Sequence, residues 1–179
     1  MLTVNDQIIL AVDENGNFTG EYIPKIVGHT GEGKRHLAIT VLLYNNKGQV
    51  LLQKRKHKIF DDIWDVTGAT HPLHQEDGQD ESVEDATWRC LKIEYGIEDK
   101  MPLKNLGFFN YFVKYREYCE NEHCAILVGE YNGSLSLNSE VGYGYKWVPE
   151  EDFLEDIEKN PKNYSPWAIE AAKLIELNS

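Results

Sequence analysis

Two apolar runs joined by a tight turn constrain this chain more than any other feature of its sequence. The first run spans His36–Tyr44, the second spans Gln49–Gln53, and the turn between them reads Asn-Asn-Lys-Gly. Both runs are rich in Val, Ile and Leu, which is typical of central strands that are buried on both faces. We therefore expect a hairpin at the centre of a sheet that helices cover.

Turn residues and helix caps divide the rest of the chain into strands and helices. Gln7–Val12 and the turn Asp13–Asn17 predict an N-terminal hairpin, whereas Phe60–Asp80 is expected to be irregular. Further strands are expected over Phe108–Tyr115, Ala125–Tyr131 and Tyr143–Val148. Helices are expected over Ser82–Tyr95, with Ser82 as N-cap and Gly96 after its end, and over Pro149–Lys159 and Ser165–Leu177. This order indicates an α+β fold with a mixed sheet packed by helices.

Length and cysteine usage indicate one domain in a reducing compartment. The chain has 179 residues and no linker rich in Pro, Gly or Ser. Its three cysteines, Cys90, Cys119 and Cys124, are expected to be reduced thiols. The N-terminal segment lacks the features of a signal peptide, and no apolar stretch approaches membrane-spanning length. These observations predict a cytoplasmic protein and leave its oligomeric state open.

The charge balance restricts the partners. Thirty acidic and 18 basic residues give a net charge of −12, which argues against nucleic acid and membrane surfaces. A small anionic substrate is compatible with this charge where metal ions or a cluster of cations reverse the local field. The basic residues gather in the run Lys54–Lys58, which is either a solvated loop or an anion site to which Lys25, Lys34 and Arg35 could add.

Two carboxylates two residues apart are the first sign of a metal site. In a strand, Glu120 and Glu122 point to one face, which Cys124 and Ile126 share and which is therefore expected to be interior. Like charges side by side in an interior are unfavourable unless a metal ion or a shared proton relieves them. A solvated turn is the alternative interpretation of this polar segment.

Three histidines and a further glutamate supply additional donors. His29, His36 and His71 are, with carboxylates, suitable ligands for Zn²⁺, Mn²⁺ or Mg²⁺, although spacing alone does not bring them together. Glu94 lies on the predicted inner stripe of the helix Ser82–Tyr95, where a carboxylate is costly unless a cation or a donor meets it. The alternative is that Glu94 pairs with a lysine.

The same helix resembles the Nudix box. Glu81, Arg89, Leu91, Glu94, Gly96 and Ile97 stand at positions of that pattern. The opening glycine of the pattern falls on Gln75, and two of its glutamates fall on Cys90 and Ile93. Of the usual cluster of Nudix glutamates, only Glu94 remains to hold Mg²⁺.

A wider resemblance, over about Gln7 to Ala172, is to the type I isopentenyl-diphosphate isomerases, which have the Nudix fold. It rests on motifs in matching order: Gly28–Thr30, Arg35–Ala38, Asn46–Gln49, Trp64, His71-Pro72, Glu81–Ala86, Glu120–Glu122, Glu140-Val141, Trp147 and Ser165–Trp167. The resemblance implies a single Nudix domain over 1–179, with a mixed sheet sandwiched between helices. Its core would span about 33–150, with an N-terminal hairpin at 5–30 and C-terminal helices at 150–177 packed on it.

The resemblance also implies a site. Its metal ligands fall on His29, His36, His71, Glu120 and Glu122, and its contact to a diphosphate-bound Mg²⁺ falls on Glu94. Its diphosphate contacts fall on Lys25, Arg55 and, less directly, Lys58. Its active-site tyrosine falls on Tyr111 and the tryptophan of its hydrocarbon pocket on Trp167. The implied cofactor is Mg²⁺, with Mn²⁺ or Zn²⁺ at the His/Glu site.

One departure decides the predicted reaction. The catalytic cysteine of the isomerases falls on Ala69. Isomerisation needs an acid and a base on opposite faces of the allylic unit, and a methyl group supplies neither. The sequence therefore predicts a metal-dependent Nudix hydrolase that cleaves isopentenyl or dimethylallyl diphosphate to the monophosphate, with Glu94, Glu122 and Tyr111 as catalytic residues. The alternatives are the isomerase, a hydrolase of a nucleoside-diphosphate derivative, and a protein that binds the diphosphate without catalysis.

Overall fold

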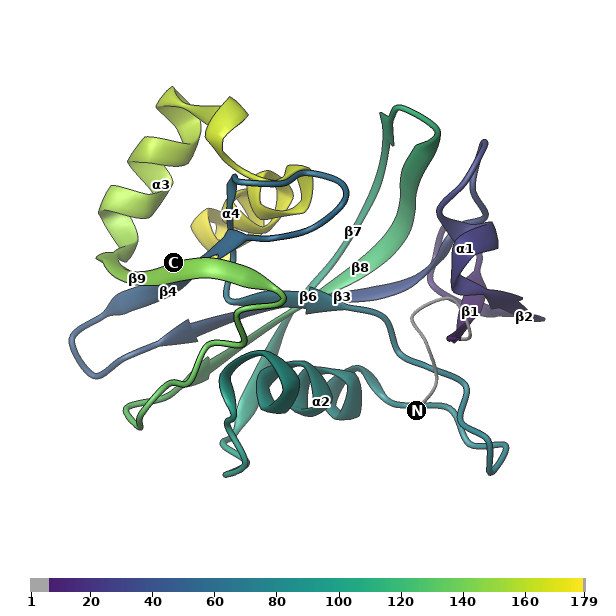
Figure 1. Cartoon of the computed structure of the whole chain (residues 1–179), viewed down its shortest axis with the longest axis horizontal. Coiled ribbons are helices and arrows are strands. Elements are labelled where there is room, and N and C mark those ends of the chain that lie inside the picture. Colours follow the sequence, from purple (N-terminus) through teal and green to yellow (C-terminus); the bar gives the residue numbers. More distant parts are fainter. Residues whose placement is uncertain (1–6, 179) are drawn as a thin grey trace.

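A single mixed sheet of nine strands forms the centre of the molecule in a computed structural model that describes residues 7–178 (Figure 1). The strands are β1 (Ile8–Val12), β2 (Phe18–Pro24), β3 (His36–Tyr44), β4 (Gln49–Arg55), β5 (Trp64–Asp65), β6 (Gly68–Thr70), β7 (Leu103–Tyr115), β8 (Tyr118–Glu130) and β9 (Gly142–Pro149). The helices are α1 (Lys25–Gly28), α2 (Val83–Tyr95), α3 (Glu150–Lys159) and α4 (Pro166–Asn178). The predicted α+β class and mixed sheet are confirmed. Residues 1–6 and 179, which the predicted domain and the start of its N-terminal hairpin include, lie outside the described part.

β3 is the strand around which the sheet is organised. Along its whole length it pairs in parallel with β8, in a register that sets His36 beside Glu122. Its other edge is shared by β1 at His36, β6 at Ile39–Val41 and β4 at Tyr44. In the expected hairpin, β3 and β4 therefore pair only at Tyr44 and Val50, because β6 pairs with the middle of β3 on the edge that β4 would otherwise use. The long partner of β4 is instead β9.

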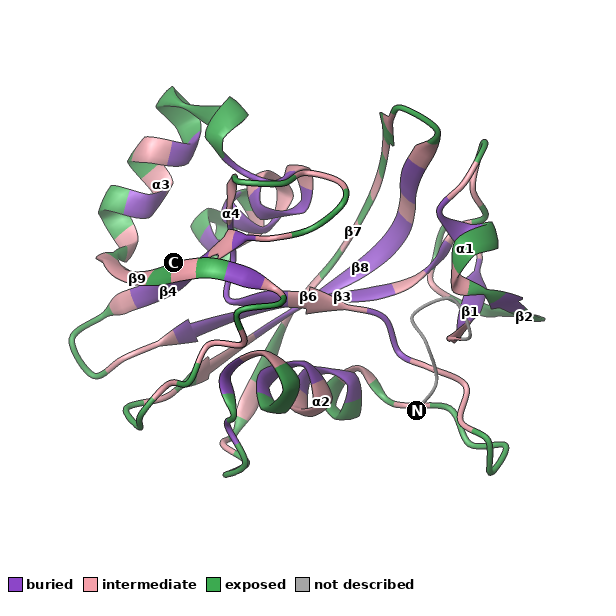
Figure 2. Ribbon diagram, in the orientation of Figure 1, coloured by how far each residue is buried: buried purple, intermediate pink, exposed green. Residues whose placement is uncertain are grey.

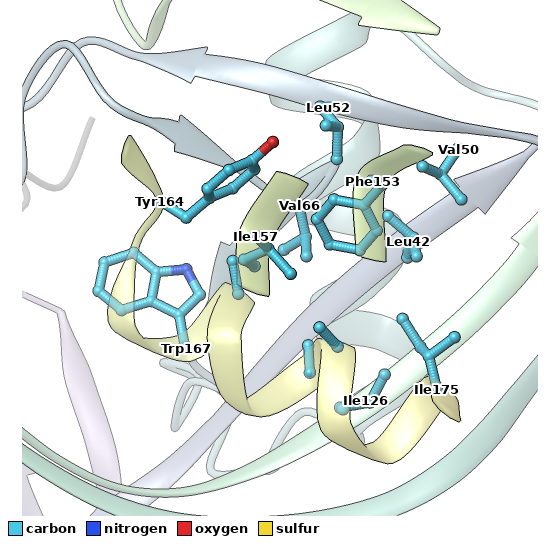
Figure 3. Close-up of a cluster of buried hydrophobic side chains, with 13 residues drawn as sticks. Leu42, Val50, Leu52, Val66, Ile126, Phe153, Ile157, Tyr164, Trp167 and Ile175 are labelled. Atoms are coloured by element: carbon cyan, nitrogen blue, oxygen red, sulfur yellow. The ribbon is translucent and has the colours of Figure 1, made fainter. Parts of the chain in front are cut away.

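Helices cover both faces of the sheet, as the continuous apolar runs predict. α2 lies on one face, and α3 and α4 lie on the other (Figure 1). Alternate residues of the central strands serve the two layers: Val41, Leu43 and Leu51 pack with α2, whereas Leu42 and Leu52 belong to the cluster with α3 and α4. Figure 2 shows that burial is concentrated along the central strands, and Figure 3 shows the larger cluster around Phe153, Ile157 and Trp167.

The predicted elements were located well except where they are short or polar. α2 begins after Ser82, whose hydroxyl accepts the N–H of Asp85 at 3.0 Å, and Gly96 ends the helix with a φ of 68°. The segment Phe60–Asp80, expected to be irregular, contains the two short strands β5 and β6. β8 begins at Tyr118, well before the expected Ala125. The interpretation of the Glu120 segment as a solvated turn is therefore wrong.

Two smaller observations concern the cysteines and the helices. Cys90, Cys119 and Cys124 are free thiols, as predicted, and all three are buried. Within residues 7–178, none of the helices has the length and apolar character needed to cross a membrane.

Candidate functional site

Five side chains that the sequence singled out converge at one end of β3. His29 follows α1, His36 opens β3, His71 follows β6, and Glu120 and Glu122 lie on β8. One donor atom from each residue lies within 4.8 Å of the donor atoms of the others, and all five residues are buried. The parallel pairing of β3 with β8 creates this arrangement, because it sets His36 beside Glu122 and leaves Glu120 two residues further along the same face.

Two of the histidines donate a hydrogen bond from Nδ1 to the backbone, which leaves Nε2 as the ring nitrogen that faces the carboxylates. The Nδ1 atoms of His29 and His36 lie 2.7 Å from the carbonyl oxygens of Lys25 and Lys34, so each Nδ1 carries a proton that it donates to the backbone. Their Nε2 atoms face carboxylates: that of His29 lies 3.2 Å from Glu120 Oε2, and that of His36 lies 3.5 Å from Glu122 Oε1. His36 Nε2 and Glu120 Oε2 are buried and have no hydrogen-bond partner among the described residues.

Lone pairs that face one another need a proton or a cation between them. A ring whose Nδ1 donates to a backbone carbonyl is also the usual state of a metal-binding histidine. The five donors, three imidazoles and two carboxylates, therefore fit a divalent cation of the Mg²⁺, Mn²⁺ or Zn²⁺ class.

The two glutamates differ in their electrostatic surroundings. Burial alone would raise the pKa of Glu122, but the contacts from His36 and His71 outweigh it and hold that pKa well below its usual range. Burial, reinforced by the charge of Glu122, raises the pKa of Glu120. Glu122 Oε2 also accepts the hydroxyl of Tyr111 at 2.6 Å, and Glu122 Oε1 lies 2.8 Å from His71 Nε2. Glu122 is therefore the carboxylate that is held ionised and oriented.

A cavity of about 130 Å³ opens onto the cluster. Its wall includes three of the predicted substrate-binding residues, Lys25, Arg55 and Trp167, together with Tyr111. Burial lowers the pKa of Lys25, against the opposing influence of the charges on Glu120 and Glu122. The cavity thus combines cations that suit phosphate oxygens with aromatic surface that suits a hydrocarbon.

Lys58 does not line this cavity. It lines a neighbouring hollow, which shares Lys25, His29, His57 and Ile59 with the cavity wall. Lys58 is exposed. A role for Lys58 in substrate binding stays a prediction.

Ala69 occupies the cavity wall on the opposite side of β3 from Glu122. It belongs to β6, where it pairs with Thr40, whereas Glu122 belongs to β8 on the other edge of β3. Both residues line the cavity. The position at which the resemblance places a cysteine thus reaches the cavity, but in this chain it presents a methyl group.

The structure does not bring Glu94 to the cluster. Its side chain lies outside the five-residue group and outside the cavity lining. Its carboxylate accepts the amide of Gln53 at 2.7 Å and the thiol of Cys90 at 3.4 Å, and a Cβ atom added to Gly68 would lie 3.4 Å from it. Burial raises the pKa of Glu94 to about 7. Its role as a ligand of a diphosphate-bound Mg²⁺ stays a prediction.

Glu94→Gln is expected to stabilise the protein at pH 8. Because the folded-state pKa of about 7 exceeds the ordinary glutamate pKa of 4.5, the folded state keeps its proton to a higher pH than the unfolded chain does. The wild type should therefore lose stability relative to the variant as pH rises from 4.5 through 7, by at most about 3 kcal/mol. Urea unfolding at pH 5 and pH 8, in the presence of a chelator, measures the difference. The exposed Glu98→Gln is the control, and a pH-independent difference for Glu94→Gln would contradict the burial argument.

Sequence reasoning missed two ionisable residues at the site. His57 lines both the cavity and the neighbouring hollow, and only its place in the basic run Lys54–Lys58 could have indicated this. Asp65 binds Arg55 through a hydrogen bond of 2.8 Å and is buried, but it lies in the segment expected to be irregular. No local pattern marks an aspartate of that kind.

Comparisons with known proteins give one matching family and relatives that cover most of the chain. The NUDIX domain matches residues 34–168. A protein of Haloarcula marismortui named isopentenyl-diphosphate Delta-isomerase is 35% identical over 174 residues, which cover 90% of this chain and 87% of the relative. A protein of the same name from Shigella boydii is 30% identical over 176 residues, with 93% of each chain covered.

Solved structures show the same fold at lower sequence identity. DR0079 of Deinococcus radiodurans superposes with a TM-score of 0.70 at 17% identity, over 94% of this chain and 98% of that one. A MutT NUDIX hydrolase of Burkholderia pseudomallei superposes with a TM-score of 0.58 at 17% identity, over 79% of this chain and 98% of that one.

Proposed function

The chain belongs to the Nudix family, and on that premise we propose that it is a divalent-metal-dependent hydrolase of an isoprenoid diphosphate. The observation that carries the reaction type is Ala69, which puts a methyl group where the cavity faces Glu122 across β3. A methyl group transfers no proton, so the acid and base pair that moves a double bond is incomplete. Isopentenyl or dimethylallyl diphosphate, cleaved to the monophosphate and inorganic phosphate, is the proposed substrate.

The side chains of the cavity divide the work of this reaction. Lys25 and Arg55 bind the phosphate oxygens, and the faces of Trp167 and Tyr111 contact the prenyl group. Water attacks the terminal phosphorus, the bond from that phosphorus to the bridging oxygen breaks, and Glu122 accepts the proton of the water. His29, His36, His71, Glu120 and Glu122 would hold Mn²⁺ or Zn²⁺, and Mg²⁺ would accompany the diphosphate; such cations would neutralise charge on the phosphoryl oxygens and make the water more acidic.

The second candidate is an isopentenyl-diphosphate isomerase. It is favoured by the relatives, which bear that name at 29–35% identity over most of the chain. It is also favoured by the hydrogen bond of 2.6 Å between Tyr111 and Glu122, which joins two proton-carrying groups in the cavity wall. In this candidate, a group other than the side chain of residue 69 would move the second proton.

One incubation separates the candidates. The protein is mixed with isopentenyl diphosphate and Mg²⁺ or Mn²⁺ in ¹⁸O-labelled water, and the products are identified by mass spectrometry and NMR. Isopentenyl monophosphate with ¹⁸O in the inorganic phosphate supports the hydrolase. Dimethylallyl diphosphate identifies an isomerase, and unchanged substrate that binds measurably identifies a protein that only binds it. A parallel set of nucleoside-diphosphate derivatives tests the remaining alternative.

A further inference from the structure

Asp65 holds the guanidinium group of Arg55 in the cavity wall. Arg55 Nη1 donates to Asp65 Oδ2 at 2.8 Å, and the two residues are only 9% and 1% exposed. The other carboxylate oxygen, Oδ1, accepts the hydroxyl of Ser165 at 2.7 Å and the backbone N–H of Val66 at 2.8 Å. Two further donors, from Ser165 and Val66, therefore hold in place the carboxylate that binds Arg55.

The loop between β4 and β5 binds the Nε side of the Arg55 guanidinium group. Arg55 Nε donates to the carbonyl oxygen of Phe60 at 3.2 Å. Phe60 has a φ of 52°, a left-handed conformation that is rare for a bulky residue. Its ring packs against Trp167 and Tyr115, with centroid separations of 5.5 and 4.8 Å. Strain that packing maintains in this way is typical of segments that orient a functional group.

The orientation of the guanidinium plane is also fixed, and some of its N–H donors have no protein partner among residues 7–178. Arg55 Cζ lies 4.6 Å from the centroid of a Trp167 ring. A guanidinium group carries about five N–H donors, of which Asp65 and Phe60 take one each. No acceptor among residues 7–178 takes the others. Since Arg55 lines the cavity, these free donors form a rigid fork of the kind that matches two oxygens of a phosphate.

Asp65 weakens the attraction of this fork for anions, because its negative charge offsets the charge of Arg55. The carboxylate therefore sets the direction of the fork at a cost in its attraction for anions. We propose that Asp65 is a positioning residue, which aims the free donors of Arg55 at the substrate phosphate and so serves turnover rather than affinity. The proposal rests on the proposed function, in which Arg55 binds the diphosphate.

Asp65→Asn tests the proposal by removing the charge and retaining the size. All three partners of Asp65 are donors, so the NH₂ group of Asn faces a donor in either orientation and at least one contact is lost. Phosphate release from dimethylallyl diphosphate is expected to show a kcat at least about tenfold lower, because misplaced groups lose rate. KM should stay unchanged or fall, because a negative charge has left the site. The control is Asp62→Asn, an exposed residue on the loop between β4 and β5, which should change neither kcat nor KM.

The double variant shows whether Asp65 acts through Arg55. In an Arg55→Ala background, Asp65→Asn should lower kcat by less than about threefold, because there is no guanidinium left to position. The proposal is overturned if the single variant keeps the wild-type kcat, if only KM rises, or if the loss is equally large without Arg55.

A second measurement does not depend on turnover. The ¹⁵N NMR signal of the Arg55 Nε–H, identified by its absence in Arg55→Ala, should persist in the wild type because the Phe60 carbonyl protects it from exchange. It should be lost at the same pH in Asp65→Asn and weakened in Ser165→Ala, which keeps the charge and serves if the first variant does not fold. A persistent signal in both variants would overturn the proposal. If no diphosphate is turned over, the proposed function fails, and this measurement alone decides the role of Asp65.

Discussion

Glu122→Gln is expected to lower turnover by about 10²–10⁴-fold, the usual range for loss of a positioned acid or base. Glu122 is the central acceptor of the site: Oε1 lies 2.8 Å from His71 Nε2 and Oε2 accepts the Tyr111 hydroxyl at 2.6 Å. Glutamine has nearly the same shape, but its amide nitrogen cannot accept a proton or bind a cation. Steady-state phosphate release with Mg²⁺ measures the loss.

The same variant should lose its response to metal. A cation that binds only the folded state raises the free energy of unfolding by about 2.7 kcal/mol at a hundred times its Kd. Thermal unfolding with Mg²⁺, Mn²⁺ or Zn²⁺ against a chelator should therefore show a rise in Tm for the wild type and little or none for Glu122→Gln. Glu130→Gln, on the same strand but exposed, is the matched control. If Glu122→Gln keeps the full rise in Tm, the five-residue cluster is not the metal site.

Ala69→Cys is expected to create an activity rather than remove one. The new thiol would enter the cavity from β6, on the other side of β3 from Glu122, and would supply the missing proton-transfer group. Some conversion of isopentenyl to dimethylallyl diphosphate should then appear, because correct placement contributes more to rate than the acidity of the group once the substrate is held. NMR of the products, with the wild type alongside, detects the new allylic diphosphate.

Ala69→Ser is the matched control for this experiment. Its hydroxyl is similar in size to the thiol but far less acidic, so it should give no isomerisation above the wild type. Phosphate release should change little in either variant, because residue 69 has no part in the attack on phosphorus. Isomerisation by the wild type at an enzymatic rate would contradict the argument, and Tyr111 would then be the first residue to test as the second proton carrier.

The sequence predicted those parts of the fold that follow from local pattern. Continuous apolar residues marked β3 and β4, and a serine cap with a following glycine marked α2. β5 and β6 could not be predicted, because strands of two or three residues show no periodicity. They form because they pair with the edges of β4 and β3, respectively. Similarly, the polar residues at the start of β8 hide a strand that its neighbours β3 and β7 stabilise.

In the candidate site, too, local pattern predicts some residues, and the folded arrangement alone reveals the others. Residue types and spacing predicted two carboxylates on one face of a strand, but the three histidines were assigned to them through the family resemblance alone. The parallel pairing of β3 with β8 brings His36 to the two glutamates, whereas His71 reaches them through the pairing of β6 with β3 and His29 through its place after α1. No sequence pattern shows which buried groups hold Arg55, since the contacts of Asp65 and Phe60 depend on how one loop folds back.

The shared register of β3 and β8 gives the cluster a second consequence, for folding. Residues on both faces of β8 are buried, Cys124 and Ile126 on one and Ala125 and Leu127 on the other, so hydrophobicity distinguishes poorly between alignments of the two strands. A slip of one residue would turn Glu120 and Glu122 to the opposite face and dismantle the site. Binding of a metal ion would therefore stabilise only those chains in which β3 and β8 are paired in the native register, and it would select against misaligned strands during folding.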